Sequence, residues 1–248
     1  MAKTNSKTFA VGAMLAISFF AVLALIFAPV FGADKDGKAM NGLTYADDLF
    51  NKLSKGSSYF IPKLQKSAQG FAGRSFQADV TLKKSDGAPA PETAALAAKL
   101  FTAAGATATA DGANLAVSGD LGVVLAAVLR DADEMYRNDG KAVAERYGVK
   151  EKDALRAWWT SFSAVDKYLK KNGKVEEAKM VSDVMKKGVE TAYNYYGVEA
   201  QKVADKALLM TGLLVFYVIY TMWWGFAIFY MFDGVGLTMT KAKVKKEA

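Results

Sequence analysis

The chain has 248 residues and a formal net charge of +7, and it contains neither cysteine nor histidine. These two absences exclude a disulfide framework, a thiolate or imidazole metal site, and a serine or cysteine nucleophile activated by histidine. A general acid or base would have to be Asp, Glu, Lys or Tyr, and the sequence has no EF-hand spacing and no Gly-rich phosphate loop. We therefore expect a protein that is not an enzyme and that holds no cofactor and no metal.

The positive charge is concentrated at the two ends of the chain. Residues 1–8 carry two lysines, and residues 241–248 carry four lysines against one glutamate, so the ends hold +5 of the +7. The rest of the chain is close to neutral, which argues against nucleic acid as a partner, because such a partner requires a basic face to neutralise its phosphates.

The first apolar segment covers residues 8–32 and contains no ionisable residue. At about 1.5 Å per residue it exceeds the roughly 30 Å thickness of a bilayer's hydrocarbon core, and it lacks the polar stripe of a water-exposed helix. We predict a transmembrane helix over 9–32, preceded by a cytoplasmic tail, 1–8. A cleaved signal peptide is the alternative, but its apolar region normally runs about 7 to 15 residues, so an uncleaved anchor is favoured.

A second uncharged segment predicts a transmembrane helix over 207–232. Its aromatic residues Trp223, Trp224 and Tyr230 fit a belt at the cytoplasmic interface; the wall of a quinone, lipid or partner-helix site is the alternative. Lysines flank the outer ends of both segments and mixed charges flank the inner ends. The positive-inside rule therefore places both termini, including the basic tail 233–248, in the cytoplasm and residues 33–206 outside a bacterial cytoplasmic (inner) membrane.

Between the spans the sequence predicts a mainly α-helical bundle with a small α+β insert. Residues 33–74 have apolar residues at helical spacing, interrupted near Gly56 and Pro62, which predicts two juxtamembrane helices. Residues 75–137 predict a β-α-β-β-α unit, with a type I′ turn at Asp111 and Gly112 and a last helix capped by Asp120. Such a unit can bury one face of its sheet beneath two helices.

Residues 138–206 predict the helical hairpin of the bundle. Its second helix begins near Val175 and meets no proline before the second span, so one continuous helix is expected, with Gly188 and Gly197 as places to bend. Neighbouring residues on a helix point about 100° apart, so Trp158 and Trp159 face different directions. Burial of both in the bundle is favoured; the alternative is that one is buried and the other is an exposed anchor for a partner. For the tyrosines near the second span, an interface belt is favoured over a docking surface. The candidate partner- or lipid-interface residues are Trp158, Trp159, Tyr193, Tyr196, Trp223, Trp224 and Tyr230.

These features favour a non-enzymatic, membrane-anchored accessory or scaffold subunit of a larger membrane protein complex. It would bind other membrane protein subunits or a second copy of itself, and it would contact the lipid bilayer. An extracytoplasmic ligand-sensing protein that signals through a partner is the alternative, because many receptors place a helical body between two spans. Transport and catalysis rank last, since neither span carries an intramembrane charge.

Overall fold

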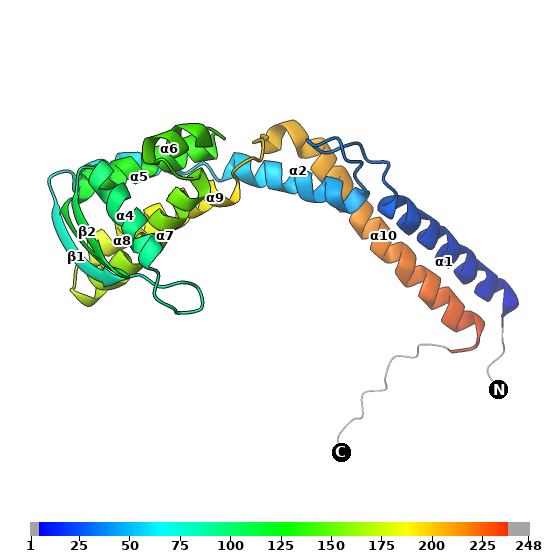
Figure 1. The fold of residues 1–248 in the computed structure, drawn as a ribbon. Coiled ribbons are helices and arrows are strands. Elements are labelled where there is room, and N and C mark those ends of the chain that lie inside the picture. Colours follow the sequence, from blue (N-terminus) through cyan, green and yellow to red (C-terminus); the bar gives the residue numbers. More distant parts are fainter. Residues whose placement is uncertain (1–4, 238–248) are drawn as a thin grey trace, which may run out of the picture. The chain divides into compact units, whose positions relative to one another are not determined.

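The computed structural model describes residues 5–237, so Lys3 and the four lysines after residue 240 lie outside the described range. The chain divides into two compact units: Met1–Leu53 with Gln201–Ala248, called unit 1, and Ser54–Ala200, called unit 2. Within the described range the elements are mostly helices (Figure 1). In chain order they are α1 (Ser6–Phe27), α2 (Gly42–Ser57), α3 (Ile61–Ala68), η1 (Gln69–Phe71), β1 (Ser75–Thr81), α4 (Pro91–Ala103), β2 (Thr107–Asp111), β3 (Asn114–Asp120), α5 (Leu121–Tyr136), α6 (Gly140–Tyr147), α7 (Glu151–Lys171), α8 (Val175–Asp183), η2 (Val184–Glu190), α9 (Thr191–Asn194), η3 (Val203–Lys206) and α10 (Ala207–Gly234).

In unit 1, helices α1 and α10 lie side by side and antiparallel (Figure 1). Both are long and apolar enough to cross a membrane, over Ser6–Phe27 and Val203–Gly234, and only 6% of the most apolar window of each is buried. The core helix of a soluble protein would be mostly buried. The two helices therefore present most of their apolar surface outward.

The first apolar helix is shorter than predicted. It ends at Phe27, and the expected residues up to Gly32 lie beyond it. Ala28 adopts φ −71° and ψ 143° because the ring of Pro29 disfavours helical backbone at the preceding residue.

The prediction of one continuous helix into the second span is wrong. Residues 184–190 form a π-helical turn that contains Gly188, and α9 ends at Asn194. Gly197 then has φ 85°, a conformation that favours glycine, and the chain becomes helical again only at Val203. Both glycines thus coincide with departures from the α-helix, and the second interrupts it completely.

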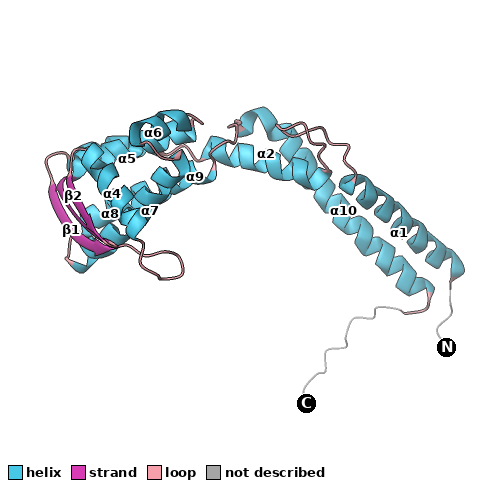
Figure 2. Cartoon of the chain, viewed as in Figure 1, coloured by secondary structure: helices cyan, strands magenta, loops and turns pink. Residues whose placement is uncertain are grey.

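Unit 2 contains a three-stranded antiparallel sheet in the order β1-β3-β2, and the predicted β-α-β-β-α order is confirmed. Alternate residues of β1 and β3 are buried. Helices α4, α5 and α7 contact the strands, and Figure 2 shows helices on one face of the sheet only. The alternating pattern therefore reflects a sheet with one packed face and one solvent face.

The hairpin between β2 and β3 turns one residue later than predicted. Asp111 pairs with Asn114, so the two loop residues are Gly112 and Ala113. Of these two, only Gly112 has a positive φ, 55°. Positive φ at the first loop residue alone corresponds to a type II′ turn, so the predicted type I′ turn is wrong.

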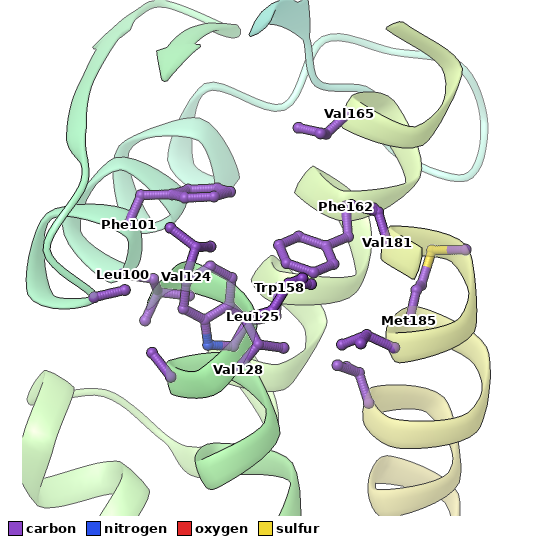
Figure 3. Close-up of a cluster of buried hydrophobic side chains, with 14 of the residues drawn as sticks. Leu100, Phe101, Val124, Leu125, Val128, Trp158, Phe162, Val165, Val181 and Met185 are labelled. Carbon is purple, nitrogen blue, oxygen red and sulfur yellow. The ribbon is translucent and has the colours of Figure 1, made fainter. Parts of the chain in front are cut away.

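A single hydrophobic cluster fills unit 2 and includes residues from α3 to α9. At its centre the indole of Trp158 contacts the rings of Phe101 and Phe162 edge-on, with centroids 5.0 and 5.7 Å away (Figure 3). The strand-containing segment 75–137 and the following helices up to α9 therefore share one core.

Candidate functional site

Helices α1 and α10 approach each other closely at Gly12, which is buried. A Cβ atom placed on this residue would lie 2.6 Å from the Met231 amide nitrogen and 2.9 Å from the Ala227 carbonyl oxygen. Only glycine allows the two backbones to approach so closely, as in small-residue contacts between membrane helices. Near the same end of the pair, the Asn5 amide donates to the Gly234 carbonyl at 2.9 Å.

Two of the predicted site residues of α10 also contact α1. The Trp223 indole N–H donates to the Leu15 carbonyl at 3.1 Å, and the Trp224 ring lies 4.8 Å from Phe19 and 5.5 Å from Phe20. In hydrocarbon an indole N–H without an acceptor is costly, so the Leu15 carbonyl is a suitable partner. Both tryptophans are half-buried, and each makes a contact between α10 and α1.

The remaining apolar surface of α10 faces outward. Tyr230 is half-buried and contacts only the neighbouring rings of Phe226 and Phe229 among the aromatic side chains described. The large exposed apolar residues of α10 are Leu208, Leu214, Val215, Phe216, Tyr217, Val218, Ile219, Met222, Phe226, Phe229 and Phe232. Exposed apolar surface of this extent is typical of membrane or protein interaction sites.

Trp158 lies in the core of unit 2 and does not reach solvent. Its indole N–H donates to Asp131 at 2.9 Å, and the same buried carboxylate accepts from Tyr147 at 2.5 Å and from Arg146 at 2.6 Å. Burial raises the pKa of Asp131, while these donors and the Arg146 charge act in the opposite direction. Because every oxygen of this carboxylate is already engaged, we assign the cluster a structural role.

The prediction that both tryptophans are buried is wrong for Trp159, which is 41% exposed and whose indole N–H donates to Glu190 at 3.3 Å. On the same helix, the Lys152 ammonium lies 5.6 Å from the ring centroid of Tyr193 and 5.7 Å from that of Tyr196. We call these five residues the α7–α9 surface. Its three aromatic residues, Trp159, Tyr193 and Tyr196, are of the types that are enriched at protein interfaces.

A buried lysine that the sequence did not indicate lies at the end of α2. Lys55 is 2% exposed, and its ammonium donates to the Asn138 side-chain oxygen at 3.0 Å and to the carbonyls of Tyr195 and Val198 at 3.1 and 2.6 Å. Burial lowers the pKa of Lys55, and the negative charge of Glu199 opposes this shift. Three oxygen acceptors use all three ammonium protons and compensate for the lost hydration.

Asn138 holds this cluster together. It is the non-glycine residue with positive φ in the described chain, at 65°, a conformation that asparagine tolerates better than most residues. Its side-chain oxygen also accepts from the Gly197 amide at 2.8 Å, and its side-chain nitrogen donates to Val198 at 3.1 Å. The sequence around Asn138 does not reveal these contacts, because its partners are some 60 and 80 positions away.

A shallow pocket of about 220 Å³ opens beside this cluster. The rings of Tyr59 and Tyr136 stack within it, with centroids 5.0 Å apart, and Arg137 donates to the Tyr59 hydroxyl at 2.7 Å. Its lining residues are Lys55, Tyr59, Tyr136, Arg137, Asn138, Glu199 and Ala200.

Comparison of the chain with protein-family models, with curated proteins and with solved structures finds no match. Within residues 5–237, no group of three or more acidic side chains is placed to hold a metal ion. Function must therefore be inferred from the geometry of the helix pair, the α7–α9 surface and the pocket.

Proposed function

We propose that this chain is a non-enzymatic accessory or scaffold subunit of a larger membrane protein complex, anchored by α1 and α10 in a bacterial cytoplasmic membrane. The observation that supports it is the outward apolar surface of the helix pair, in which only 6% of each apolar window is buried. Exposing a large apolar side chain to water costs about 1.5–3 kcal/mol. Many such residues face outward here, so lipid and partner helices are the surroundings in which the pair is stable.

In the proposed topology both termini are cytoplasmic and residues 33–206 are extracytoplasmic. The basic ends of the sequence support this orientation. The contacts of Gly12 and Leu15 with α10 support retention of α1 as a permanent anchor, because cleavage near Gly32 would remove the acceptor for the Trp223 indole. Mass spectrometry of the purified chain should therefore find peptides from α1.

Two surfaces are the proposed partner contacts. One is the outward face of α10, which would pack against other membrane subunits. The other is the α7–α9 surface, where exposed Trp159 and half-buried Tyr193 and Tyr196 are of the residue types that often contribute most binding energy at interfaces.

The test is purification of the tagged full-length chain in mild detergent, followed by cross-linking and mass spectrometry. We expect stable membrane partners, with cross-links that map to α10 and the α7–α9 surface. Trp159→Ala should reduce partner recovery, whereas Val175→Ala, another exposed apolar residue of unit 2, should leave it unchanged. Recovery of the wild-type chain as a lone monomer would contradict the proposal.

A further inference from the structure

We propose that the pocket of unit 2 binds a small α-amino acid, with the ligand carboxylate on Arg137 and the ligand ammonium group on Glu199. The pocket lies within unit 2, Ser54–Ala200. This binding activity goes beyond the proposed scaffold function and does not depend on it.

Arg137 is positioned to receive a carboxylate. One of its terminal nitrogens, Nη2, donates to the Tyr59 hydroxyl at 2.7 Å and lies 3.1 Å from Asp133. The Tyr59 hydroxyl in turn donates to Asp133 at 2.6 Å, so Arg137, Tyr59 and Asp133 hold one another in position. Nε and Nη1 of Arg137 have no hydrogen-bond partner among the described residues. Because both contacts fall on Nη2, the N–H groups of Nε and Nη1 remain as single donors for a ligand carboxylate.

Glu199 supplies the opposite charge. Its exposed carboxylate has no hydrogen bond or ion pair within residues 5–237, although it lies near enough to Lys55 to influence that ammonium group. Lys55 does not neutralise it by direct contact, because all three Lys55 protons are donated to Asn138 and to two backbone carbonyls. The Glu199 carboxylate is thus available for a ligand ammonium group.

The aromatic part of the lining offers carbon surface to an aliphatic side chain. The stacked rings of Tyr59 and Tyr136 line the pocket together with Lys55 and Arg137, and both hydroxyls are occupied: Tyr59 pairs with Asp133, and Tyr136 donates to the Lys55 carbonyl. Burial raises the pKa of Tyr136 to about 12, so this ring remains neutral. Pockets for drug-sized ligands measure about 300–1,000 Å³, and the smaller volume of about 220 Å³ favours a ligand of amino-acid size.

The lining residues come from three separate segments of the chain, and hydrogen bonds of Asn138 connect these segments. Asn138 accepts from Lys55, accepts from the Gly197 amide and donates to Val198. The pocket is therefore formed before a ligand arrives, and binding does not require much ordering of the chain.

The test is isothermal titration of the full-length chain in detergent with leucine and its two one-charge analogues, 4-methylpentanoate and 3-methylbutylamine. A parallel thermal-shift panel covers the other common amino acids. We expect an aliphatic amino acid to bind, and each analogue that lacks one charged group to bind about tenfold or more weakly, a loss of about 1.4 kcal/mol. Equal binding of the plain carboxylate, or no binding by any amino acid, would overturn the proposal.

Variants of the two charged residues complete the test. Glu199→Gln and Arg137→Gln should each weaken binding by about tenfold or more. The matched surface changes Glu145→Gln and Arg156→Gln should leave it unchanged, since both residues are exposed and do not line the pocket. Near-ultraviolet circular dichroism verifies that each variant is folded. Unaltered binding by folded Glu199→Gln would overturn the assignment of the ammonium site, whatever the outcome of partner purification.

Discussion

Trp223 on α10 donates its indole N–H to the main-chain carbonyl of Leu15 on α1, across 3.1 Å. One turn away, the rings of Phe19 and Tyr220 stack with their centroids 4.2 Å apart. These contacts bring two segments together that are some 200 residues apart in the sequence. The two apolar helices are therefore a specific antiparallel pair, joined by polar and aromatic contacts as well as by the close approach at Gly12.

The helix pair should be sensitive to the size of the residue at position 12. Gly12→Leu would place side-chain atoms into the Met231 and Ala227 backbone, and overpacking of this kind costs about 1–3 kcal/mol. The chain lacks cysteine, so the double variant Phe19→Cys, Tyr220→Cys can report the pairing by its yield with a short bifunctional maleimide. We expect Gly12→Leu to lower this yield.

Gly225→Leu is the matched control for that experiment, because a Cβ atom at Gly225 has no neighbour within 4 Å among the described residues. It should leave the cross-linking yield unchanged. Equal effects of the two leucine substitutions would show that α1 and α10 do not pair at Gly12.

The two adjacent tryptophans of α7 should differ strongly in their contribution to stability. Trp158 is fully buried and hydrogen-bonded to Asp131, and removal of such an aromatic side chain costs about 3–5 kcal/mol. Trp159 is 41% exposed, and Trp159→Ala should cost about 1 kcal/mol or less. Urea unfolding in detergent, followed by circular dichroism, measures both, and similar losses would refute the assignment of Trp158 to the core.

The positive φ of Asn138 can be separated from its hydrogen bonds by two substitutions. Glycine adopts φ 65° without strain but makes no side-chain bonds, whereas alanine loses the bonds and is also strained. We therefore expect the free energy of unfolding to fall in the order wild type, Asn138→Gly, Asn138→Ala, with the last two about 0.5–1 kcal/mol apart. An alanine variant as stable as the glycine variant would contradict this.

Asp120 should make stability depend on acidic pH. The Gly73 amide, followed by those of Val123 and Gly122, lowers the pKa of Asp120 below its ordinary value of 3.8, although desolvation opposes the shift. A carboxylate whose folded-state pKa is lowered stabilises the fold above the unfolded-state pKa, and this contribution is lost as the pH falls through the folded-state value.

Thermal melting of wild type and Asp120→Asn from neutral pH down to about pH 2.5 measures this effect. We expect wild type to be the more stable near neutral pH and the difference to shrink below about pH 4. Asp79→Asn, an exposed position on β1, should show no such trend. A difference for Asp120→Asn that stays constant with pH would mean that the carboxylate charge does not matter for this cap.

The sequence predicted those parts of the fold that depend on local patterns. The β-α-β-β-α order and Asp120 at the cap of α5 both depend on neighbouring residues, and both are found as expected. The apolar run extends beyond the end of α1 because Pro29 disfavours helical backbone at Ala28. Local spacing also suggested an uninterrupted helix through Gly197, where the tertiary contact with Asn138 favours a left-handed turn.

The pocket could not be predicted in the same way. Lys55, Arg137 and Glu199 are ordinary charged residues in the sequence, and nothing local distinguishes a buried lysine from an exposed one. They become a site only because contacts over long sequence distances bring α2, α5 and the segment after α9 together. The aromatic candidates were easier to recognise, but only the fold separates buried Trp158 from exposed Trp159.

The proposed membrane topology can be tested most directly with single cysteines in this cysteine-free chain. Ser6→Cys lies at the start of α1, and Glu145→Cys lies at an exposed position of α6. With a membrane-impermeant maleimide, position 145 should be labelled in intact cells whose outer membrane is permeabilised, and position 6 only after lysis. Labelling of position 6 in intact cells, or protection of position 145 until lysis, would contradict two spans with cytoplasmic ends.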